Sequence, residues 1–237
     1  MSARSLAILE QHVTGCRRCP RLVAHREHAA AHPRPAFAGQ DYWARPVPGF
    51  GDPDARIYVL GMATSAHGGN RTGRAFTGNA TADWLIAAMH RAGLANQASS
   101  THRGDGLRLD RAWMASAVRC APPRDRTTAG ERRECARYLD AELELLTGVR
   151  VIVCLGALAW NAAAAWAGLR PRPPFGHGRE HPAGDGRILL GCYHPSPQNT
   201  RTGRLTAAML DDVLGRAAEV AGGGRSRSPL VAEAREV

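Results

Sequence analysis

RIYVLG, at residues 56–61, is the first of four apolar runs that decide the fold. Each run is rich in branched or large apolar side chains and ends in small or turn-forming residues, which is the pattern of a buried strand. The runs are RIYVLG at 56–61, AWMASAV at 112–118, RVIVCLG at 150–156 and RILLGC at 187–192.

Helical patterns separate and follow these strands. Apolar residues at spacings of three and four predict helices at about 80–92, 131–146, 157–166 and 205–220, with an N-terminal helix at about 4–13. Strands that alternate with helices predict an α/β fold in which a parallel sheet of four strands carries helices on both faces. We expect one domain over residues 1–220 and a disordered tail, rich in Gly, Ser and Arg, over residues 221–237.

The charge of the chain restricts its chemistry. The 237 residues carry a net charge of +10, and all 31 basic residues are arginine. Without lysine there is no Walker-type phosphate loop and no internal Schiff-base amine. The excess of positive charge favours a polyanionic partner, nucleic acid first and an anionic membrane second. Codon bias explains arginine in place of lysine, but not the excess of basic over acidic residues.

The apolar stretches of the chain are short. None reaches the length of a membrane span, and polar residues from Glu10 onward interrupt the N-terminal apolar patch. We therefore expect a cytoplasmic protein with no membrane partner. In that compartment cysteines are more often ligands or core residues than disulfides.

The turns that follow the predicted strands are dense in Gly, Pro, His, Asn and Arg. They occupy residues 62–78, 119–123 and 193–204. In an open parallel sheet the ligand lies outside the carboxyl ends of the strands. Convergence of these three turns on one edge predicts the functional site there.

Four cysteines have a spacing that suggests a metal or a cluster. Cys16 and Cys19 form a C-x2-C pair, and Cys120 and Cys135 can complete four ligands. Ligand count alone leaves zinc and an iron–sulfur cluster equally open, and unrelated cysteines are the alternative. Cys154 and Cys192 fall inside strand patterns and are expected in the core.

Single residues in the strand-end turns carry further expectations. His194 follows a strand and is followed by prolines, which fix the backbone. It is therefore either a structural loop residue or a residue that donates a ring N–H to a ligand. Asn199 and the run from Arg201 to Arg204 favour a loop that binds nucleic acid.

The glycine-rich turn contains two residues that stand out. Phe76 lies among the glycines of residues 68–78 and can stack on an extruded base, although the turn can also be an ordinary surface loop. Asn79 is placed to cap the helix that begins at residue 80.

Together these motifs closely resemble family 5 of the uracil-DNA glycosylase superfamily, the iron–sulfur type. The resemblance rests on GMATSAHGGNRTGRAFTG at 61–78, SAVRCAPP at 116–123, HPSPQNTRTGR at 194–204 and the four cysteines, and it runs from about residue 16 to about residue 214. It implies a three-layer α/β/α sandwich with a central four-stranded parallel sheet. It also implies removal of uracil, and of other deaminated or damaged bases, from DNA.

The resemblance also assigns roles to residues. It implies a [4Fe–4S] cluster on Cys16, Cys19, Cys120 and Cys135, a hydrogen bond from His194 to the uracil carbonyl, and stacking of Phe76 on the base. The loop that contains Asn199 is implied to lie beside the flipped nucleotide. Base contacts are expected at Gly61, Ala63, Phe76, Ser116 and Asn199, and DNA contacts at Arg71, Arg74, Arg201 and Arg204.

Three positions depart from the family pattern. Asn79 stands where the family has an aspartate that helps to orient or activate water, and an amide is no general base. Ser116 stands where related iron–sulfur glycosylases often have an asparagine, which predicts relaxed base specificity. Thr64 replaces the usual proline.

We therefore expect a monomeric, monofunctional DNA glycosylase whose catalytic residues are His194 and Asn79, with activity reduced by the missing carboxylate. Without a lysine amine, base removal is expected to leave an intact abasic site. A catalytically silent iron–sulfur protein that binds DNA or senses damage is the main alternative. An electron carrier and a glycosylase that traps its product covalently are further alternatives, but the strand-end loops disfavour the carrier and the basic insertion expected of the trapping subgroup is not visible.

Overall fold

The computed structural model describes residues 2–222, so the predicted tail lies almost wholly outside the described residues. Its central sheet has six strands in the order β1-β3-β2-β4-β6-β5. The strands are β1 (Phe50–Gly51), β2 (Ile57–Ala63), β3 (Ala112–Val118), β4 (Val151–Leu155), β5 (Glu180–Pro182) and β6 (Ile188–Cys192). All four predicted strands are present as the parallel centre of this sheet, from β3 to β6.

The expected count of four strands was too low. The two added strands, β1 and β5, lie at the edges of the sheet and pair antiparallel with β3 and β6. They have two and three residues and contain glycine or proline, so they have no alternating pattern that a sequence could display.

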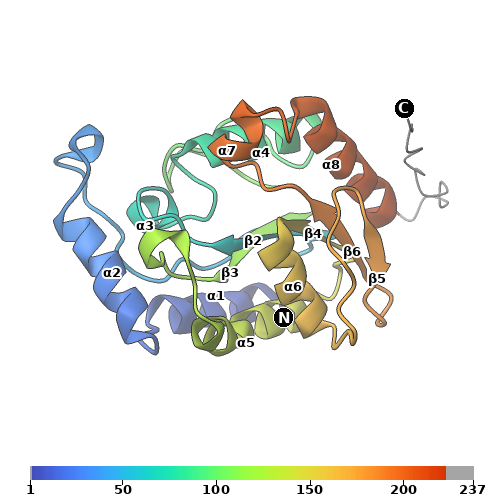
Figure 1. The fold of residues 1–237 in the computed structure, drawn as a ribbon, viewed down its shortest axis with the longest axis horizontal. Coiled ribbons are helices and arrows are strands. Elements are labelled where there is room, and N and C mark those ends of the chain that lie inside the picture. The colour runs from blue at the N-terminus through green and yellow to red at the C-terminus, as the bar shows by residue number, and fades with distance from the viewer. Residues whose placement is uncertain (1, 223–237) are drawn as a thin grey trace.

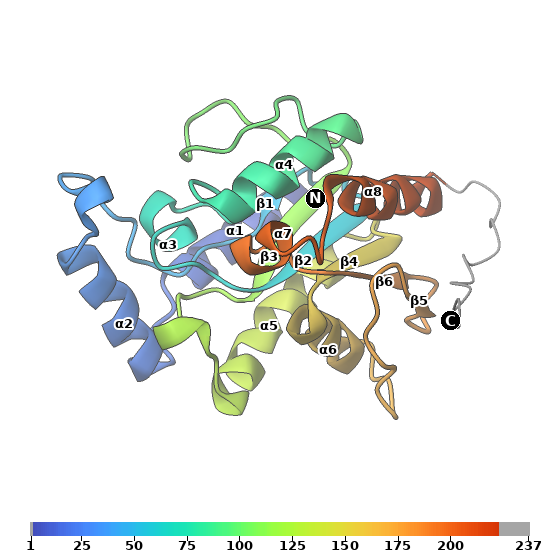
Figure 2. The same cartoon turned by 45° about the horizontal axis from the view of Figure 1, so that its top comes forward.

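Helices cover both faces of the sheet, as Figures 1 and 2 show. The α-helices are α1 (Ser2–Thr14), α2 (Pro20–Ala31), α3 (Gly69–Thr72), α4 (Ala80–Arg91), α5 (Ala129–Leu145), α6 (Ala157–Trp166), α7 (Pro197–Arg201) and α8 (Ala207–Ala221). The five predicted helices correspond to α1, α4, α5, α6 and α8. The short α3 and α7 and the whole of α2 were not predicted.

The two faces of the sheet bury separate apolar clusters. On one face, side chains of α4 and α8 such as Leu85, Met89 and Leu214 pack on the strands. On the other face, α5 and α6 contribute Leu139, Trp160 and their neighbours. Burial of two faces makes the strands continuously apolar, which is why the sequence displays them so clearly.

Local sequence sets the start of the longest helix. Thr128 accepts a hydrogen bond from the backbone N–H of Glu131, and the Glu131 side chain accepts one from the backbone N–H of Thr128. This capping box satisfies two N–H groups that have no partner inside the helix. It fixes where α5 begins and therefore which of its side chains face the sheet.

A buried ion pair joins α5 to the sheet. Both guanidinium Nη atoms of Arg119 donate to the Glu142 carboxylate at 2.8 Å, and the Tyr58 hydroxyl donates to the same group. The side chains of Arg119 and Glu142 are 1% and 2% exposed. Because each charge would be very costly if left alone in the interior, the pair ties α5 to β2 and to the residue that follows β3.

Replacement of Glu142 by alanine should leave Arg119 uncompensated and lower the free energy of unfolding by about 3–5 kcal/mol. Urea denaturation at pH 7 measures the change. Glu144→Ala, at an exposed position of the same helix, should change the value by less than about 0.5 kcal/mol. Equal effects of the two variants would show that the ion pair is not a major anchor of α5.

Candidate active site at the carboxyl edge of the sheet

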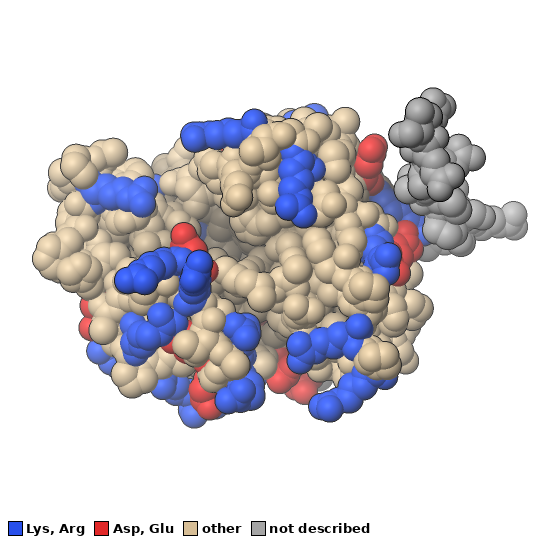
Figure 3. Space-filling model, viewed as in Figure 1, with Lys and Arg blue, Asp and Glu red and all other residues tan. Residues whose placement is uncertain are grey.

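The turns that follow the parallel strands lie at one edge of the sheet. β2 and β3 pair in a register that places Gly61 opposite Ser116, and β4 pairs with β6 so that Leu155 lies opposite Cys192. The face seen in Figure 3 is hollowed where β2 leaves the sheet, between α3 and α7, with arginines spread around the hollow. The residues expected to contact a base are therefore gathered at this edge.

Phe76 lies directly against Gly61. An ideal Cβ atom at Gly61 would come within 2.6 Å of Phe76 Cζ, so a side chain at this point of β2 would displace the Phe76 ring. Phe76 itself is half-buried and has a left-handed backbone conformation, with φ of 49°. That conformation is unfavourable for a residue with a side chain, by about 1–2 kcal/mol, and persists only where the surroundings hold it.

Asn79 caps α4, as its position predicted. Its Oδ1 atom accepts a hydrogen bond of 2.9 Å from the backbone N–H of Ala82. Its Nδ2 atom lies close to the backbone of Gly68, since an ideal Cβ atom built on Gly68 would come within 2.3 Å of it. One end of the amide is thus committed to the helix and the other faces the glycine-rich turn.

His194 leaves the sheet directly after Tyr193, beside the end of β4. An ideal Cβ at Gly156 would lie 3.4 Å from the His194 Cβ atom. Burial lowers the pKa of His194, so its ring is neutral near pH 7. A neutral imidazole offers one N–H donor and one acceptor nitrogen.

The turn after His194 is held by its own hydrogen bonds. The Asn199 Nδ2 atom and the Ser196 backbone N–H each donate to the His194 carbonyl oxygen at 2.8 Å. Ser196 also caps α7. The structure therefore places the Asn199 amide on the backbone of His194, a local role that the expected base contact did not anticipate.

The four arginines expected to contact DNA have different environments. Arg201 and Arg204 are exposed, and the Arg204 guanidinium lies 4.8 Å from the centre of the Tyr193 ring. Arg71 is partly buried and donates to the carbonyl oxygens of His67 and Gly78 at 2.9 Å. The Arg71 guanidinium links two points of the glycine-rich turn, whereas Arg201 and Arg204 are exposed to solvent, where a ligand can reach them.

The four cysteines singled out by spacing line one cavity that is partly open to solvent. Cys16 follows α1, Cys19 precedes α2, Cys120 follows β3 and Cys135 lies in α5. Burial raises the pKa values of Cys19, Cys120 and Cys135, that of Cys135 to about 12. Four thiols from four separate parts of the chain therefore meet at one place.

N–H groups surround these sulfur atoms. Arg26 Nη1 donates to Cys120 Sγ at 3.2 Å, and the Arg119 backbone N–H donates to Cys135 Sγ at 3.3 Å. The Nε atoms of Arg26 and Arg119, two arginines that line the cavity, are buried without a hydrogen-bond partner. Unpaired buried donors are costly, so the surroundings suit a group that carries additional acceptor atoms.

Comparison with known proteins now places the chain in a family. The sequence profile of the "Uracil DNA glycosylase superfamily" matches residues 48–217. A "Type-5 uracil-DNA glycosylase" of Thermus thermophilus is 52% identical over 213 residues, 90% of this chain and 96% of the relative. The chain belongs to the type-5 uracil-DNA glycosylases.

Two further type-5 uracil-DNA glycosylases support this assignment. The protein of Mycobacterium tuberculosis is 50% identical over 223 residues, 93% of this chain and 83% of the relative. The protein of Pyrobaculum aerophilum is 45% identical over 210 residues, 89% of this chain and 91% of the relative. The mixed α/β sandwich is consistent with this family.

Among residues 2–222 no group of three or more His, Cys, Asp or Glu side chains stands close enough to hold a single metal ion. No helix in the same range is long and apolar enough to cross a membrane.

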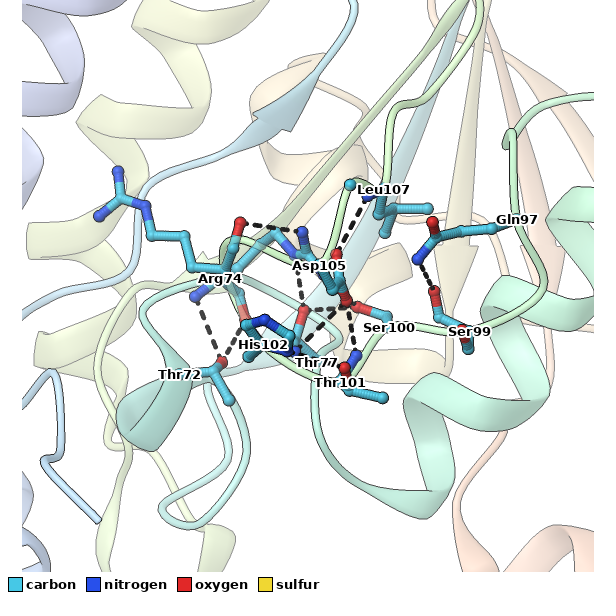
Figure 4. A network of polar contacts seen from close by, with 12 residues as sticks. Thr72, Arg74, Thr77, Gln97, Ser99, Ser100, Thr101, His102, Asp105 and Leu107 are labelled. Carbon is cyan, nitrogen blue, oxygen red and sulfur yellow. Dashed lines mark hydrogen bonds and ion pairs between the residues drawn. The ribbon is translucent and has the colours of Figure 1, made fainter.

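Arg74 was expected to contact DNA, but its side chain is buried. Its guanidinium is 3% exposed and forms an ion pair of 2.7 Å with Asp105, which is 6% exposed. It also donates to Thr77 Oγ1 and Ser100 Oγ (Figure 4). A guanidinium so enclosed is a brace within the protein, and we do not include Arg74 in the DNA-contacting set.

This network joins the glycine-rich turn to residues 99–107. The Asp105 carboxylate accepts hydrogen bonds from the backbone N–H groups of Thr101, His102 and Leu107 (Figure 4). The Gly78 backbone N–H donates to the Ser100 carbonyl oxygen at 2.8 Å. Phe76 and Asn79 are thus held by a segment that carries no recognisable motif, and its contribution could not be read from the sequence.

Replacement of Asp105 by asparagine should lower the free energy of unfolding at pH 7 by about 3 kcal/mol, because the buried Arg74 charge loses its partner. Burial raises the pKa of Asp105, but the Arg74 and backbone hydrogen bonds outweigh this and hold the pKa far below its usual range. The carboxylate therefore stabilises the fold above the unfolded pKa of about 4, and the stability is lost as pH falls through the folded value.

Urea denaturation at several pH values tests this expectation. The difference between wild type and Asp105→Asn should narrow as the pH falls below about 4, because the unfolded chain then takes up a proton that the folded carboxylate does not. Asp110→Asn, whose side chain is 67% exposed in the native protein, serves as the control and should change little. A difference that stays constant with pH would contradict the charge-based explanation.

Proposed function

We propose that this protein removes uracil from DNA by hydrolysing the N-glycosidic bond, as the first step of base excision repair. The observation that carries the proposal is the meeting of Gly61, Phe76, Ser116 and His194 at the carboxyl edge of one parallel sheet. Its relatives at 45–52% identity are named as type-5 uracil-DNA glycosylases. Other deaminated or damaged bases are further candidate substrates.

The base must leave the DNA stack to reach these residues. Enzymes that act on a base flip it into a pocket, where aromatic side chains stack on it and polar groups read its edge. We assign stacking to Phe76 and edge recognition to the Ser116 hydroxyl, with Gly61 and Ala63 forming the wall along β2. A hydroxyl has fewer hydrogen-bonding atoms than an amide, which supports relaxed selectivity.

His194 serves the leaving group. Cleavage of the bond leaves negative charge on the uracil ring, and a well-placed donor for such charge contributes about 3 kcal/mol. A neutral His194 ring has the N–H that this requires, and the fixed turn around its backbone supports a constant position. Asn199 then acts through the backbone of His194.

The water that attacks the sugar receives less help from Asn79 than a carboxylate at this position would give. The Asn79 amide has no basic atom, and its Oδ1 is already bonded to the Ala82 N–H. Its Nδ2 group can orient a water molecule but cannot remove a proton. Without a base the rate is reduced. The reaction still proceeds, because the sugar develops cationic character before water attacks and needs only weak help from a nucleophile.

DNA binding depends on surface charge. The net charge of +10 and the exposed guanidinium groups of Arg201 and Arg204 favour phosphate contacts beside the flipped nucleotide. Arg71 supports the glycine-rich turn from inside. The protein acts as a monomer, and the cytoplasmic location stays a prediction.

We also propose a [4Fe–4S] cluster on Cys16, Cys19, Cys120 and Cys135. The shared cavity and the unpaired Nε donors of Arg26 and Arg119 support a group that brings its own hydrogen-bond acceptors, as the sulfur atoms of a cluster do. Zinc needs four thiolates about 2.3 Å from a single point, a tighter arrangement. When bound, the cluster supplies metal–thiolate bonds that join α1, α2, β3 and α5.

The similarity to proteins named as uracil-DNA glycosylases does not favour the alternative function. A silent protein that binds damaged DNA without cleaving the bond would use the same surface, and Asn79 and Ser116 are the residues that favour it. The two functions differ in whether the base is released.

Replacement of Asn79 by aspartate should raise the single-turnover rate of uracil excision by about tenfold or more, because general-base help typically contributes ~10²–10⁴-fold. Aspartate caps a helix as well as asparagine, so stability should change little. Asn96→Asp, in an exposed loop, is the control for added negative charge. A rate that is unchanged or lower would refute the role assigned to position 79.

Replacement of His194 by alanine should slow excision about 10²-fold or more, the usual loss when one donor to a developing anion is removed. Affinity for uracil-containing duplex should stay within about threefold, since phosphate contacts supply the binding. His90→Ala, on the exposed side of α4, should leave both quantities unchanged. Equal loss of binding and excision would assign His194 a structural role.

Protein purified without oxygen should be brown, absorb broadly in the visible range and contain about four iron atoms per chain. Cys135→Ser should lose iron and colour, whereas Cys154→Ser, within the buried strand β4, should keep both. Stoichiometric zinc in place of iron would overturn the cluster assignment.

A further inference from the structure

His177 lies in the segment between α6 and β5, outside every motif that identified the site. Its imidazole ring stacks on the ring of Tyr193, with centroids 4.9 Å apart and planes inclined by 29°. Tyr193 is the residue immediately before His194. A residue distant in sequence is therefore in direct contact with the end of β6 that presents His194.

The hydrogen bond that His177 accepts defines its protonation state. Its Nδ1 atom accepts a hydrogen bond of 3.1 Å from the backbone N–H of Tyr193. A backbone N–H is always a donor, so Nδ1 must carry the lone pair. The proton of the neutral ring is then on Nε2, and this tautomer satisfies the contact with Tyr193.

The segment that carries His177 is itself anchored. Trp160 Nε1 donates to the Pro173 carbonyl oxygen at 2.8 Å, and the Phe175 ring lies 6.1 Å from the rings of both Trp160 and Tyr193. The Gly178 backbone N–H donates to Gly191 in β6 at 2.7 Å. These contacts hold the acceptor nitrogen of His177 against the strand end.

The backbone around His194 is thus held on both sides. His177 accepts the N–H of the preceding residue, and Asn199 donates to the carbonyl oxygen of His194 itself. Two residues of backbone therefore have little freedom to rotate at the point where the His194 side chain leaves the sheet. Small displacements of a catalytic group are costly, since an error of 1 Å can reduce a rate about 10²-fold.

We propose that His177 is a positioning residue that fixes the end of β6 and so holds His194 against the flipped base. This inference rests on the proposed role of His194. His177 itself is not assigned a contact with DNA or with the base.

The charged groups around His177 agree with a neutral ring. Burial lowers the pKa of His177, and the hydrogen bond to Met209 and the charge of Asp212 on α8 offset this only in part. Arg204 packs on the Tyr193 ring from the turn before α8. Protonation in acid would place an Nδ1–H against the Tyr193 N–H and break the contact.

Two substitutions distinguish the contribution of the acceptor atom from that of the imidazole ring. His177→Leu removes the acceptor, whereas His177→Asn places an Oδ1 atom where Nδ1 stood and retains an acceptor that does not titrate. His181→Leu, four residues further along and bonded to Pro182 instead, is the matched control. For each variant, hydrogen exchange at the Tyr193 amide, single-turnover excision and affinity for uracil-containing duplex are measured.

His177→Leu should speed exchange at the Tyr193 amide about tenfold or more and slow excision by a similar factor, with affinity for the duplex within about twofold. His177→Asn should excise within about threefold of wild type, and His181→Leu should match wild type throughout. Excision at the wild-type rate in His177→Leu, or no recovery in His177→Asn, would overturn the inference.

The amide measurement also separates this inference from the proposed function. If wild type releases no uracil, the proposed function fails, whatever the variants do. If the Tyr193 amide exchanges equally in wild type and His177→Leu, the bracing contact itself is refuted, whether or not uracil is released.

Discussion

Parallel pairing of β3, β2, β4 and β6 sends each of these strands out of the sheet at the same edge. The residues that follow them are distant in sequence, yet the register brings Gly61 opposite Ser116 and carries His194 out beside the end of β4. The active site depends on this constraint, because no single loop contains enough of the required groups. Turns supply the chemistry and the sheet supplies their relative positions.

Arginine has two distinct uses in this chain. Arg119 with Glu142 and Arg74 with Asp105 are ion pairs in which all four side chains are nearly inaccessible to solvent. They anchor α5 to the sheet and hold the glycine-rich turn, whereas Arg201 and Arg204 stay exposed beside the site. The net charge of the chain is therefore a poor measure of the positive surface available to DNA, because some of the arginines are buried in ion pairs. The planar guanidinium, with several donors, suits the buried use as well as phosphate contacts.

Patterns of period and spacing predicted the central strands, the helices α1, α4, α5, α6 and α8, and the gathering of the strand-end turns. They did not predict β1, β5 or α2, because two short edge strands and a helix rich in His and Arg have weak periodicity. The resemblance placed Arg74 among the DNA contacts, whereas its side chain is buried against Asp105. Asp105 and His177 could not be found from sequence, since their partners lie more than a dozen residues away and become neighbours only in the fold.

Release of the base by the unmodified protein tests the account most directly. A duplex with a single uracil is incubated with excess protein, and free uracil and strand length are measured before and after alkali. The account predicts stoichiometric release of uracil and an intact strand that breaks only after alkali, because the chain has no lysine amine to attack the abasic sugar. Tight binding of the duplex without release of uracil would contradict it and identify a protein that only recognises the lesion.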